Sequence, residues 1–321
     1  MKAIMYNRTG DSSVLTLRER PMPEPGPGEV LVRMAVSGVN PTDWKARASA
    51  PHRTLDGWHV PNQDGAGVVD SVGPAVPGPG VTELKPGQRV WLWDVAFGGS
   101  EGTAQEAVVV PALKAVPLPD SETFDAGASL GIPALTAHRA LTASEHGPAR
   151  LSPGTLEGQT VLVTGGAGAV GHAAIQLARW AGATVIATVS SDEKAELARR
   201  AGAGVVVNYR TRDVAAEVRR IAPKGVDVIV DVNLAANVAA DLAAMKNGGT
   251  VSAYAGTSDE TVAIPVRAAM GKNVRFQFVL TYTVTDQQKA DAVAAVSAAL
   301  ADGALRVGKM HGLQITRFSL E

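Results

Sequence analysis

The sequence of 321 residues contains no cysteine, and this absence excludes several kinds of chemistry at once. Without thiols the chain has no disulfide framework, zinc–cysteine site, iron–sulfur cluster or cysteine nucleophile. Aromatic residues are scarce at 4%, and the net charge is −1 without a basic block. The sequence therefore predicts neither an aromatic stacking platform nor a basic surface for nucleic acid.

Long hydrophobic runs are also missing. No stretch reaches the roughly 18 consecutive apolar residues that a membrane-spanning helix needs. The first six residues are followed at once by Asn7, Arg8 and Asp11, so the apolar core of a signal peptide does not form. Together with the missing cysteines, these features predict a cytoplasmic protein without membrane contact.

Glycine and proline are plentiful, with 34 and 19 residues, and the length predicts two domains at about 150 residues each. In residues 1–124, short apolar runs are separated by proline and glycine clusters, of which 21–28 and 73–80 are the densest. This pattern predicts an antiparallel β-barrel or sandwich. Because apolar runs resume soon after the second cluster, we interpret it as a loop within one domain.

From about residue 158 the pattern changes to alternating strands and helices. Apolar runs predict strands at 160–164, 184–188, 205–207, 226–230, 249–254 and 274–280. Helical spacing is found at 170–181, 192–201, 213–221 and 287–300. Such alternation requires right-handed crossovers and predicts an α/β fold with a doubly wound parallel sheet.

A glycine-rich loop follows the first of these strands and opens the first helix. Gly166, Gly168 and Gly171 satisfy the pattern G-x-G-x-x-G, with Ala169 and Val170 between the last two glycines. The three glycines allow a tight turn, close approach of the backbone to a pyrophosphate, and close helix–strand packing. The helix N-terminus adds free N–H groups and a positive dipole end. The loop predicts a dinucleotide site, although S-adenosylmethionine enzymes carry similar loops.

The end of the second strand bears on which dinucleotide is bound. Sites for NAD usually place an acidic residue there to hold the ribose 2′-hydroxyl. This chain has no acid before Asp192, whereas Ser190 can donate a hydrogen bond to a 2′-phosphate and Lys194 can supply the counter-charge. We therefore predict NADPH as the cofactor. In the alternative interpretation, Ser190 and Glu193 form a capping box and Lys194 is a solvated helix residue.

Several segments together resemble one family. They lie at 25–30, 38–43, 64–69, 84–90, 131–137, 165–171 and 207–209, and cover most of residues 1–256 in the family's order. The chain resembles the zinc-independent quinone oxidoreductases of the medium-chain dehydrogenase/reductase superfamily. The resemblance implies a GroES-like β-barrel catalytic domain at 1–124, to which the chain returns at about 304–321. It also implies a Rossmann NADP(H)-binding domain at 125–303, with the cofactor in the cleft between the two domains.

The resemblance also implies contacts to the cofactor. It places Ser190, Lys194 and Tyr209 around the 2′-phosphate, and the turn at 168–170 at the pyrophosphate. Tyr209 could instead only close the edge of the sheet.

Two further residues, Asn40 and Thr136, are placed near the nicotinamide by the resemblance and are the candidate catalytic residues. Asn40 is well suited to position an acceptor oxygen. Each has a structural alternative, because Asn40 could be a turn residue before Pro41 and the Thr136 hydroxyl could bond to its own helix backbone.

The sequence departs from the family at two places. Some close relatives carry a tyrosine near the substrate just after Asp43, where this chain has Trp44 and Lys45. Relatives also continue past a Phe-x-Leu-Glu segment with a further helix and strand. This sequence ends at that segment with Glu321, so we expect a terminal piece of the family's domain to be absent from it.

The residues available favour one kind of reaction. With no cysteine, and with six histidines that lack metal-ligand spacing, we predict no metal site and no alcohol dehydrogenase chemistry. The remaining chemistry is hydride transfer to an electrophilic acceptor, which predicts an NADPH-dependent quinone reductase. A hydroquinone can take its protons from water, so a dedicated acid is not required. The alternatives are an enone or enoyl-thioester reductase, or an NADPH-binding protein with little turnover.

The expected strand at 274–280 is apolar and would lie at the sheet edge in the standard strand order. An exposed edge of this kind is an aggregation hazard unless it is covered. Two-fold pairing of this strand would cover it, and the resembled family is commonly dimeric, so we predict a homodimer.

Overall fold

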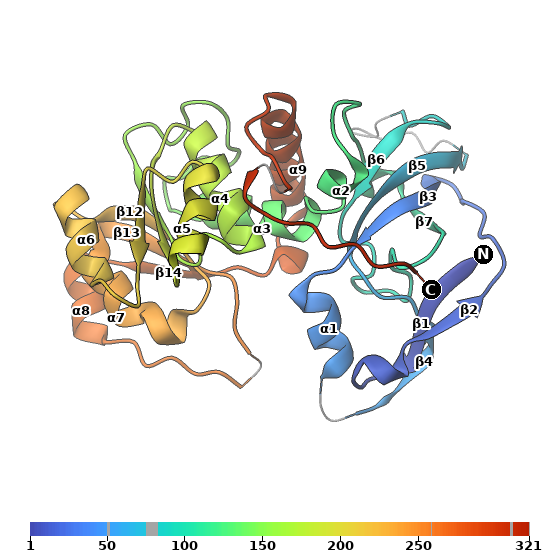
Figure 1. The fold of residues 1–321 in the computed structure, drawn as a ribbon, viewed down its shortest axis with the longest axis horizontal. Helices are drawn as coiled ribbons and strands as arrows, with labels where there is room; N and C mark the ends of the chain where they lie inside the picture. Colours follow the sequence, from blue (N-terminus) through green and yellow to red (C-terminus); the bar gives the residue numbers. More distant parts are fainter. Residues whose placement is uncertain (50–51, 75–82, 258, 309–310, 321) are drawn as a thin grey trace. The chain divides into compact units, whose positions relative to one another are not determined.

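The computed structural model describes residues 1–49, 52–74, 83–257, 259–308 and 311–320 (Figure 1). The chain forms two compact units, the first made of Met1–Ile132 with Ile315–Glu321 and the second of Pro133–Gln314. Residues 75–80 of the expected loop at 73–80, and Glu321, lie outside the described residues.

The unit boundaries lie further along the chain than the expected domain boundaries after residues 124 and 303. Residues 125–132 belong to unit 1, and within that unit the backbone N–H of Ile132 donates to the Asp64 carboxylate at 2.8 Å. The final segment is tied to the same unit by Arg317, whose Nε donates to Asp125 Oδ1 at 2.8 Å.

Unit 1 consists of two antiparallel sheets, as its short, turn-separated apolar runs predict. The five-stranded sheet has the order β7-β3-β5-β6-β8 and the three-stranded sheet the order β2-β1-β4. The strands are β1 Lys2–Arg8, β2 Thr16–Glu19, β3 Glu29–Gly38, β4 Thr54–His59, β5 Asp64–Val72, β6 Arg89–Leu92, β7 Ala107–Pro111 and β8 Ala115–Pro117. The helices are α1 Pro41–Ala48 and α2 Phe124–Gly127, with the 3-10 turns η1 Ser12–Val14 and η2 Ala112–Lys114.

One hydrophobic cluster of the unit 1 core lies on one face of the five-stranded sheet. Val30 and Val32 of β3 are fully buried with Val90 and Leu92 of β6, and Val108 of β7 joins them. These residues alternate along their strands, because successive side chains of a strand point to opposite faces. Burying each such side chain stabilises the fold by about 1.5–3 kcal/mol.

Unit 2 is built on a six-stranded parallel sheet of order β11-β10-β9-β12-β13-β14, which confirms the predicted doubly wound fold. The strands are β9 Thr160–Val163, β10 Thr184–Val189, β11 Val205–Asn208, β12 Val226–Asp231, β13 Met245–Ala253 and β14 Arg275–Phe278. The helices are α3 Gly131–Leu141, whose first two residues belong to unit 1, α4 Ala169–Trp180, α5 Asp192–Arg200, α6 Val214–Ile221, α7 Leu234–Ala244, α8 Val266–Lys272 and α9 Asp286–Ala301, with the 3-10 turn η3 Thr281–Thr283. Strand order reverses between β9 and β12, so this is the switch point at which such sheets bind ligands.

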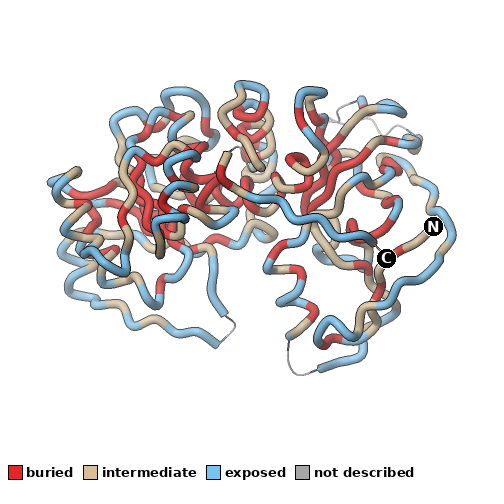
Figure 2. The backbone as a smooth tube through the Cα atoms, viewed as in Figure 1, coloured by how far each residue is buried: buried red, intermediate tan, exposed pale blue. Residues whose placement is uncertain are grey.

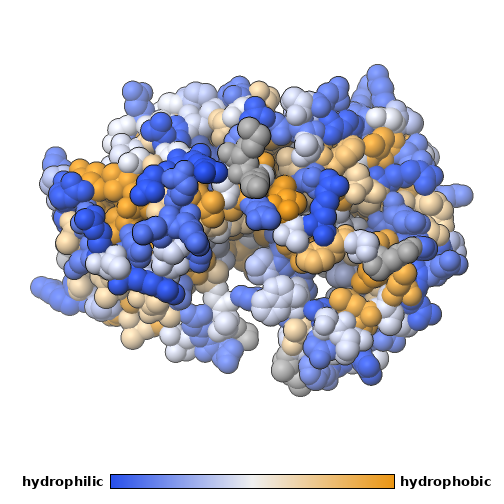
Figure 3. Space-filling view, viewed as in Figure 1, coloured by the Kyte–Doolittle hydropathy of each residue, from blue (hydrophilic) through white to orange (hydrophobic). Residues whose placement is uncertain are grey.

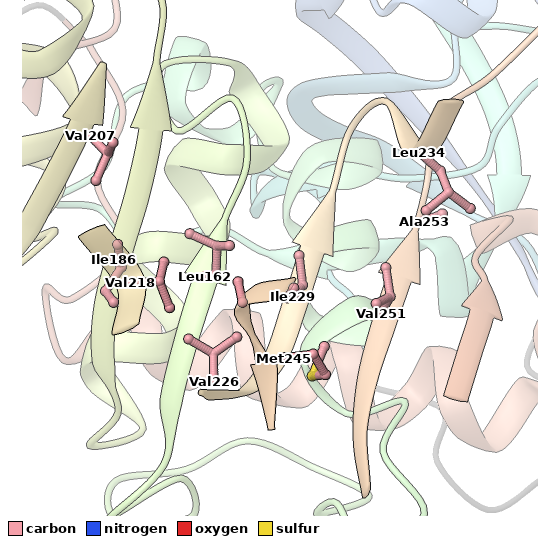
Figure 4. Close-up of a cluster of buried hydrophobic side chains, with 11 residues drawn as sticks. Leu162, Ile186, Val207, Val218, Val226, Ile229, Leu234, Met245, Val251 and Ala253 are labelled. Atoms are coloured by element: carbon pink, nitrogen blue, oxygen red, sulfur yellow. The ribbon is translucent and has the colours of Figure 1, made fainter. Parts of the chain in front are cut away.

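The helices of unit 2 form two layers. Helix α4 contacts α5 and α9, whereas α6 contacts α7, and the right-handed crossover rule puts these two groups on opposite faces of the sheet. The strands between them are buried (Figure 2), with Leu162, Ile186, Ile229 and Val251 in one cluster (Figure 4). Within the described ranges no helix is long and apolar enough to cross a membrane.

Candidate functional site

The glycine loop follows β9 and has no room for side chains at two of its glycines. A Cβ on Gly166 would lie 2.9 Å from the Cβ of Ala187, and a Cβ on Gly171 would lie 2.4 Å from the carbonyl oxygen of Gly165. Gly165 itself has φ +68°, a conformation that favours glycine. The loop therefore packs tightly against β10, and its turn lies close to the start of α4.

Helix α4 begins directly at this loop and leaves its first N–H groups open. Gly168 is the N-cap, and the first helical hydrogen bond runs from the His172 N–H to the Gly168 carbonyl at 2.7 Å. The N–H groups of Ala169, Val170 and Gly171 precede that bond and have no helical acceptor. Because Gly168 and Ala169 are exposed, these donors and the positive helix end fit a pyrophosphate.

Ser190 and Lys194 lie together just beyond the end of β10. Lys194 Nζ donates to Ser190 Oγ at 3.1 Å. The N-cap of α5 is Ser191, which accepts the Lys194 backbone N–H at 3.3 Å, so the alternative capping box of Ser190 and Glu193 is wrong. The Ser190 hydroxyl is therefore not used as a helix cap. Figure 3 shows hydrophilic side chains over α5.

Tyr209 follows β11 and lies beside the end of β10. Its backbone N–H donates to the Val189 carbonyl at 3.1 Å, and its side chain is exposed. The parallel pairing of β10 with β11 thus brings Tyr209 close to Ser190 in space, although 19 positions separate them in the sequence. These groups and the glycine loop all belong to unit 2.

Thr136 is buried in α3 and pairs with a residue that sequence reasoning missed. Its hydroxyl lies 2.6 Å from the hydroxyl of Thr281, at the start of η3. The partner is therefore another side chain and not the backbone of its own helix. No local signal links two threonines that lie so far apart in the chain.

Asn40 is the N-cap of α1 in unit 1 and directly precedes Pro41. Its backbone N–H donates to Asp43 Oδ2 at 2.7 Å, and its side-chain Nδ2 donates to Asp64 Oδ2 at 2.7 Å. Asp64 therefore holds the side-chain amide of Asn40, and Asp43 holds its backbone N–H. Burial raises the pKa of Asp43 to about 6.

Asp64 is the buried group that orients Asn40, and sequence reasoning missed it. Its Oδ2 accepts the Asn40 amide and the Ile132 N–H, while its Oδ1 has no hydrogen-bond partner within the described residues. Gly131 leaves space for this carboxyl group, since a Cβ there would lie 2.0 Å from Oδ1. Burial raises the pKa of Asp64 to about 8, so the group is mainly protonated at neutral pH. The available signal was an acid that directly precedes the small and apolar residues 65–69.

A second buried network joins the carboxyl ends of β9 and β12. Thr164 donates its hydroxyl to Asp231 Oδ2 at 3.1 Å and accepts the Val232 N–H at 2.9 Å. Asp231 also accepts the Asn233 N–H at 2.6 Å and the Asn237 side-chain amide at 2.7 Å. Sequence reasoning missed this network, which holds the strand end that precedes the glycine loop.

Taken by themselves, the two units define a class of protein. A GroES-like antiparallel unit and a Rossmann unit with a glycine loop at the switch point are the two parts of medium-chain dehydrogenases/reductases. Family models agree: one described as "Alcohol dehydrogenase GroES-like domain" matches residues 26–120, and one described as "Zinc-binding dehydrogenase" matches residues 169–301.

Individual relatives define the family more closely. A quinone oxidoreductase of Rattus norvegicus is 34% identical over 78% of this chain and 72% of the relative. A 2-haloacrylate reductase of Burkholderia sp is 34% identical over 88% of this chain and 80% of the relative. A mycobacterial protein complexed with NADPH superposes with a TM-score of 0.78 at 30% identity, over 96% of this chain and 91% of that one. The chain belongs to the quinone oxidoreductase family of the medium-chain dehydrogenase/reductase superfamily.

The zinc in one family description does not fit the residues of this chain. The sequence has no cysteine, and the described residues contain no group of three or more histidine, aspartate or glutamate side chains that could hold a metal ion. A dinucleotide does fit, because the glycine cradle excludes side chains and presents backbone donors. Trp44, which follows Asp43, is half exposed with Lys45 near its ring.

Proposed function

We propose that this protein is a zinc-independent, NADPH-dependent quinone reductase that acts in the cytoplasm. The observation that carries the proposal is the pairing of Lys194 with Ser190 beyond β10, at the position where an NAD site would place an acid. A cation and a hydroxyl group suit a 2′-phosphate, whereas a free 2′-hydroxyl carries no charge for Lys194 to pair with. The mycobacterial structure with NADPH supports this choice of cofactor.

Each cofactor-binding residue has a proposed part in this site. Lys194 and Ser190 bind the 2′-phosphate, and the exposed Tyr209 ring lies against the same group. The turn from Gly168 to Val170 binds the pyrophosphate through its N–H groups, and Gly166 and Gly171 allow the close approach.

The reaction needs little from the protein beyond binding and orientation. The nicotinamide, when bound, supplies the hydride. We propose that the Asn40 amide holds the acceptor oxygen, with its orientation maintained by Asp64 and Asp43, and that Thr136 lies near the nicotinamide. No protein acid is required, because the hydroquinone oxygens can take protons from water.

A second candidate is reduction of an alkene conjugated to a carbonyl group, such as an enone, enoyl thioester or haloacrylate. The 34% identity to a 2-haloacrylate reductase favours it, and the same hydride step would serve. A third candidate is an NADPH-binding protein with little turnover, because a fold supports binding more directly than it supports one chemistry.

One panel of acceptors separates these functions. NADPH oxidation is measured with 1,4-benzoquinone, 9,10-phenanthrenequinone, an enone, crotonyl-CoA and 2-chloroacrylate. We expect the two quinones to give the highest kcat/KM. Activity on the alkenes alone would establish the second candidate, and no oxidation with any acceptor would favour the third.

The cofactor preference is tested with Lys194→Ala. Loss of a charge-assisted hydrogen bond worth about 1.5–3 kcal/mol should raise the Kd of NADPH roughly ten- to hundredfold while leaving that of NADH unchanged. Arg199→Ala, on the same helix and with the same change in charge, is the control and should have little effect. An unchanged NADPH affinity in Lys194→Ala would contradict the assignment.

A further inference from the structure

We propose that the buried carboxylate of Asp231 makes the bound cofactor a stronger hydride donor, by favouring its oxidised, positively charged form over its reduced form. This inference rests on the proposed NADP(H) binding and is independent of the acceptor. Asp231 acts through the electric field that it produces and need not touch the cofactor.

The hydrogen bonds around Asp231 indicate an ionised carboxylate. It accepts from the Asn233 N–H at 2.6 Å, the Asn237 amide at 2.7 Å and the Thr164 hydroxyl at 3.1 Å. Burial raises the pKa of Asp231, and these three donors together with Asp241 oppose that rise. A carboxylate that accepts several hydrogen bonds is stabilised in its charged form.

The neighbouring Asp241 carries the proton of this acid pair. It is buried in α7, and its Oδ2 has no hydrogen-bond partner in the part of the chain that the structure describes. Burial, and the adjacent charge of Asp231, raise the pKa of Asp241 to about 9. Because three donors surround Asp231 whereas Asp241 Oδ2 has no partner among the described residues, the negative charge of the pair lies on Asp231.

The charge lies at the switch point of the sheet. Asp231 is the last residue of β12, and Thr164, just after β9, links it to the strand that leads into the glycine loop. The next residue, Val232, is 36% exposed and contacts the loop, since a Cβ on Gly165 would lie 3.0 Å from its Cγ1.

The order of the strands indicates which half of the cofactor is affected. The proposed 2′-phosphate residues Ser190 and Lys194 lie beyond β10, on one side of β9, and the proposed pyrophosphate loop follows β9 itself. A dinucleotide that runs from β10 across β9 continues toward β12. The nicotinamide half therefore belongs on the side of Asp231, in the crevice outside the strand ends.

Oxidation of NADPH removes two electrons and one proton as a hydride, and leaves one more positive charge on the ring. A buried anion stabilises that charge, whereas its repulsion of the phosphate groups is the same for both forms. The ratio of the two dissociation constants therefore isolates the effect on the ring. For a unit charge at roughly 10–20 Å through protein, the ratio changes about three- to thirtyfold. Tenfold corresponds to about 30 mV for a two-electron couple.

The test measures Kd for NADP⁺ and for NADPH, without an acceptor, in the wild-type protein and three variants. Asp231→Asn alone is unsuitable, because Asp241 could then ionise and restore the charge. Asp231→Asn/Asp241→Asn removes both acids and keeps their shapes. Asp241→Asn imitates the neutral acid and keeps the charge on Asp231, and Thr164→Val disturbs the network without changing its charge.

We expect the double variant to weaken NADP⁺ relative to NADPH by about three- to thirtyfold. Asp241→Asn should leave the ratio unchanged, and Thr164→Val should weaken both forms equally. An unchanged ratio of the two dissociation constants in the double variant overturns the proposal. So does a shift in Asp241→Asn as large as the shift in the double variant. Failure of the wild-type protein to bind either form would instead refute the proposed cofactor.

If the double variant does not fold, carboxyl-carbon NMR of the protein with labelled aspartate tests the same charge. At pH 7 the spectrum of Asp241→Asn should lack a protonated carboxyl signal that the wild type shows. Loss of an ionised carboxylate signal would place the charge on Asp241 and overturn the proposal.

Discussion

Replacing Asp64 with asparagine should remove a large pH dependence from the stability of unit 1. The carboxyl group is fully buried, and burial raises its pKa to about 8 in the folded protein, compared with about 3.9 for an unfolded aspartate. Between these values the folded state holds one proton more than the unfolded state. The contribution of Asp64 to stability is therefore complete below about pH 4 and is lost progressively as the pH rises toward 8.

The slope follows from the linkage relation. One proton difference changes the free energy of unfolding by about 1.4 kcal/mol per pH unit, so Asp64 alone should lower the stability by about 3 kcal/mol between pH 5 and pH 7. In Asp64→Asn this term disappears. The side-chain oxygen of asparagine can still accept the Asn40 amide and the Ile132 N–H, so the fold is preserved.

The assay is urea unfolding at several pH values, followed by tryptophan fluorescence. Four of the five tryptophans lie in unit 1, at positions 44, 58, 91 and 93, so the signal reports mainly on that unit. The quantity to compare is the difference in free energy of unfolding between variant and wild type, in which other titrating groups cancel. It should grow in favour of the variant by about 1.4 kcal/mol per pH unit from pH 5 to pH 7.

Asp56→Asn, which changes an exposed aspartate of the same unit, is the matched control and should give a flat difference. A flat difference for Asp64→Asn as well would show that Asp64 is ionised in the folded protein. Asn40 would then be held by an ionised Asp64 whose Oδ1 has no hydrogen-bond partner among the described residues.

Gly171→Ala would place a Cβ 2.4 Å from the Gly165 carbonyl oxygen, so the loop must shift. The Kd of NADPH, measured by fluorescence titration, should therefore rise at least about tenfold. An unchanged Kd would contradict the proposed pyrophosphate site. Thr136→Val leaves the Thr281 hydroxyl without its partner and should destabilise unit 2 by about 1–3 kcal/mol in thermal unfolding, and the double variant Thr136→Val/Thr281→Val should recover part of this loss. No recovery would mean that the two hydroxyls act independently. Phe278 is 65% exposed on β14, the edge strand of the sheet, and we expect light scattering to show a dimer for the wild type and a monomer for Phe278→Glu. A wild-type monomer would refute pairing through this strand.

Local sequence patterns were sufficient for the architecture of both units. The alternating runs after residue 158 correspond to β9 to β14 and to the helices α4, α5, α6 and α9, and the ends of these predicted elements differ from the observed ones by only a few residues. The reason is that periodicity, turn residues and the spacing of the glycine loop are properties of neighbouring residues. Helices α7 and α8 were not predicted. The cap of α5 was also predicted wrongly, because Ser190 and Ser191 are both good caps and only the path of the chain selects Ser191.

The partners of the polar side chains were beyond the reach of such patterns. Asn40 bonds to Asp64, Thr136 to Thr281, and Thr164 to Asp231, and each pair is brought together by strands or helices that are distant in the chain. A hydrogen bond forms only when donor and acceptor are placed to within a few tenths of an ångström, and that placement is reached only when whole elements have packed. The raised pKa values of Asp64 and Asp241 have the same origin, because burial is a property of the folded protein. The sequence alone thus predicts the class of fold, whereas the protonation and orientation of the groups in the proposed site depend on tertiary contacts.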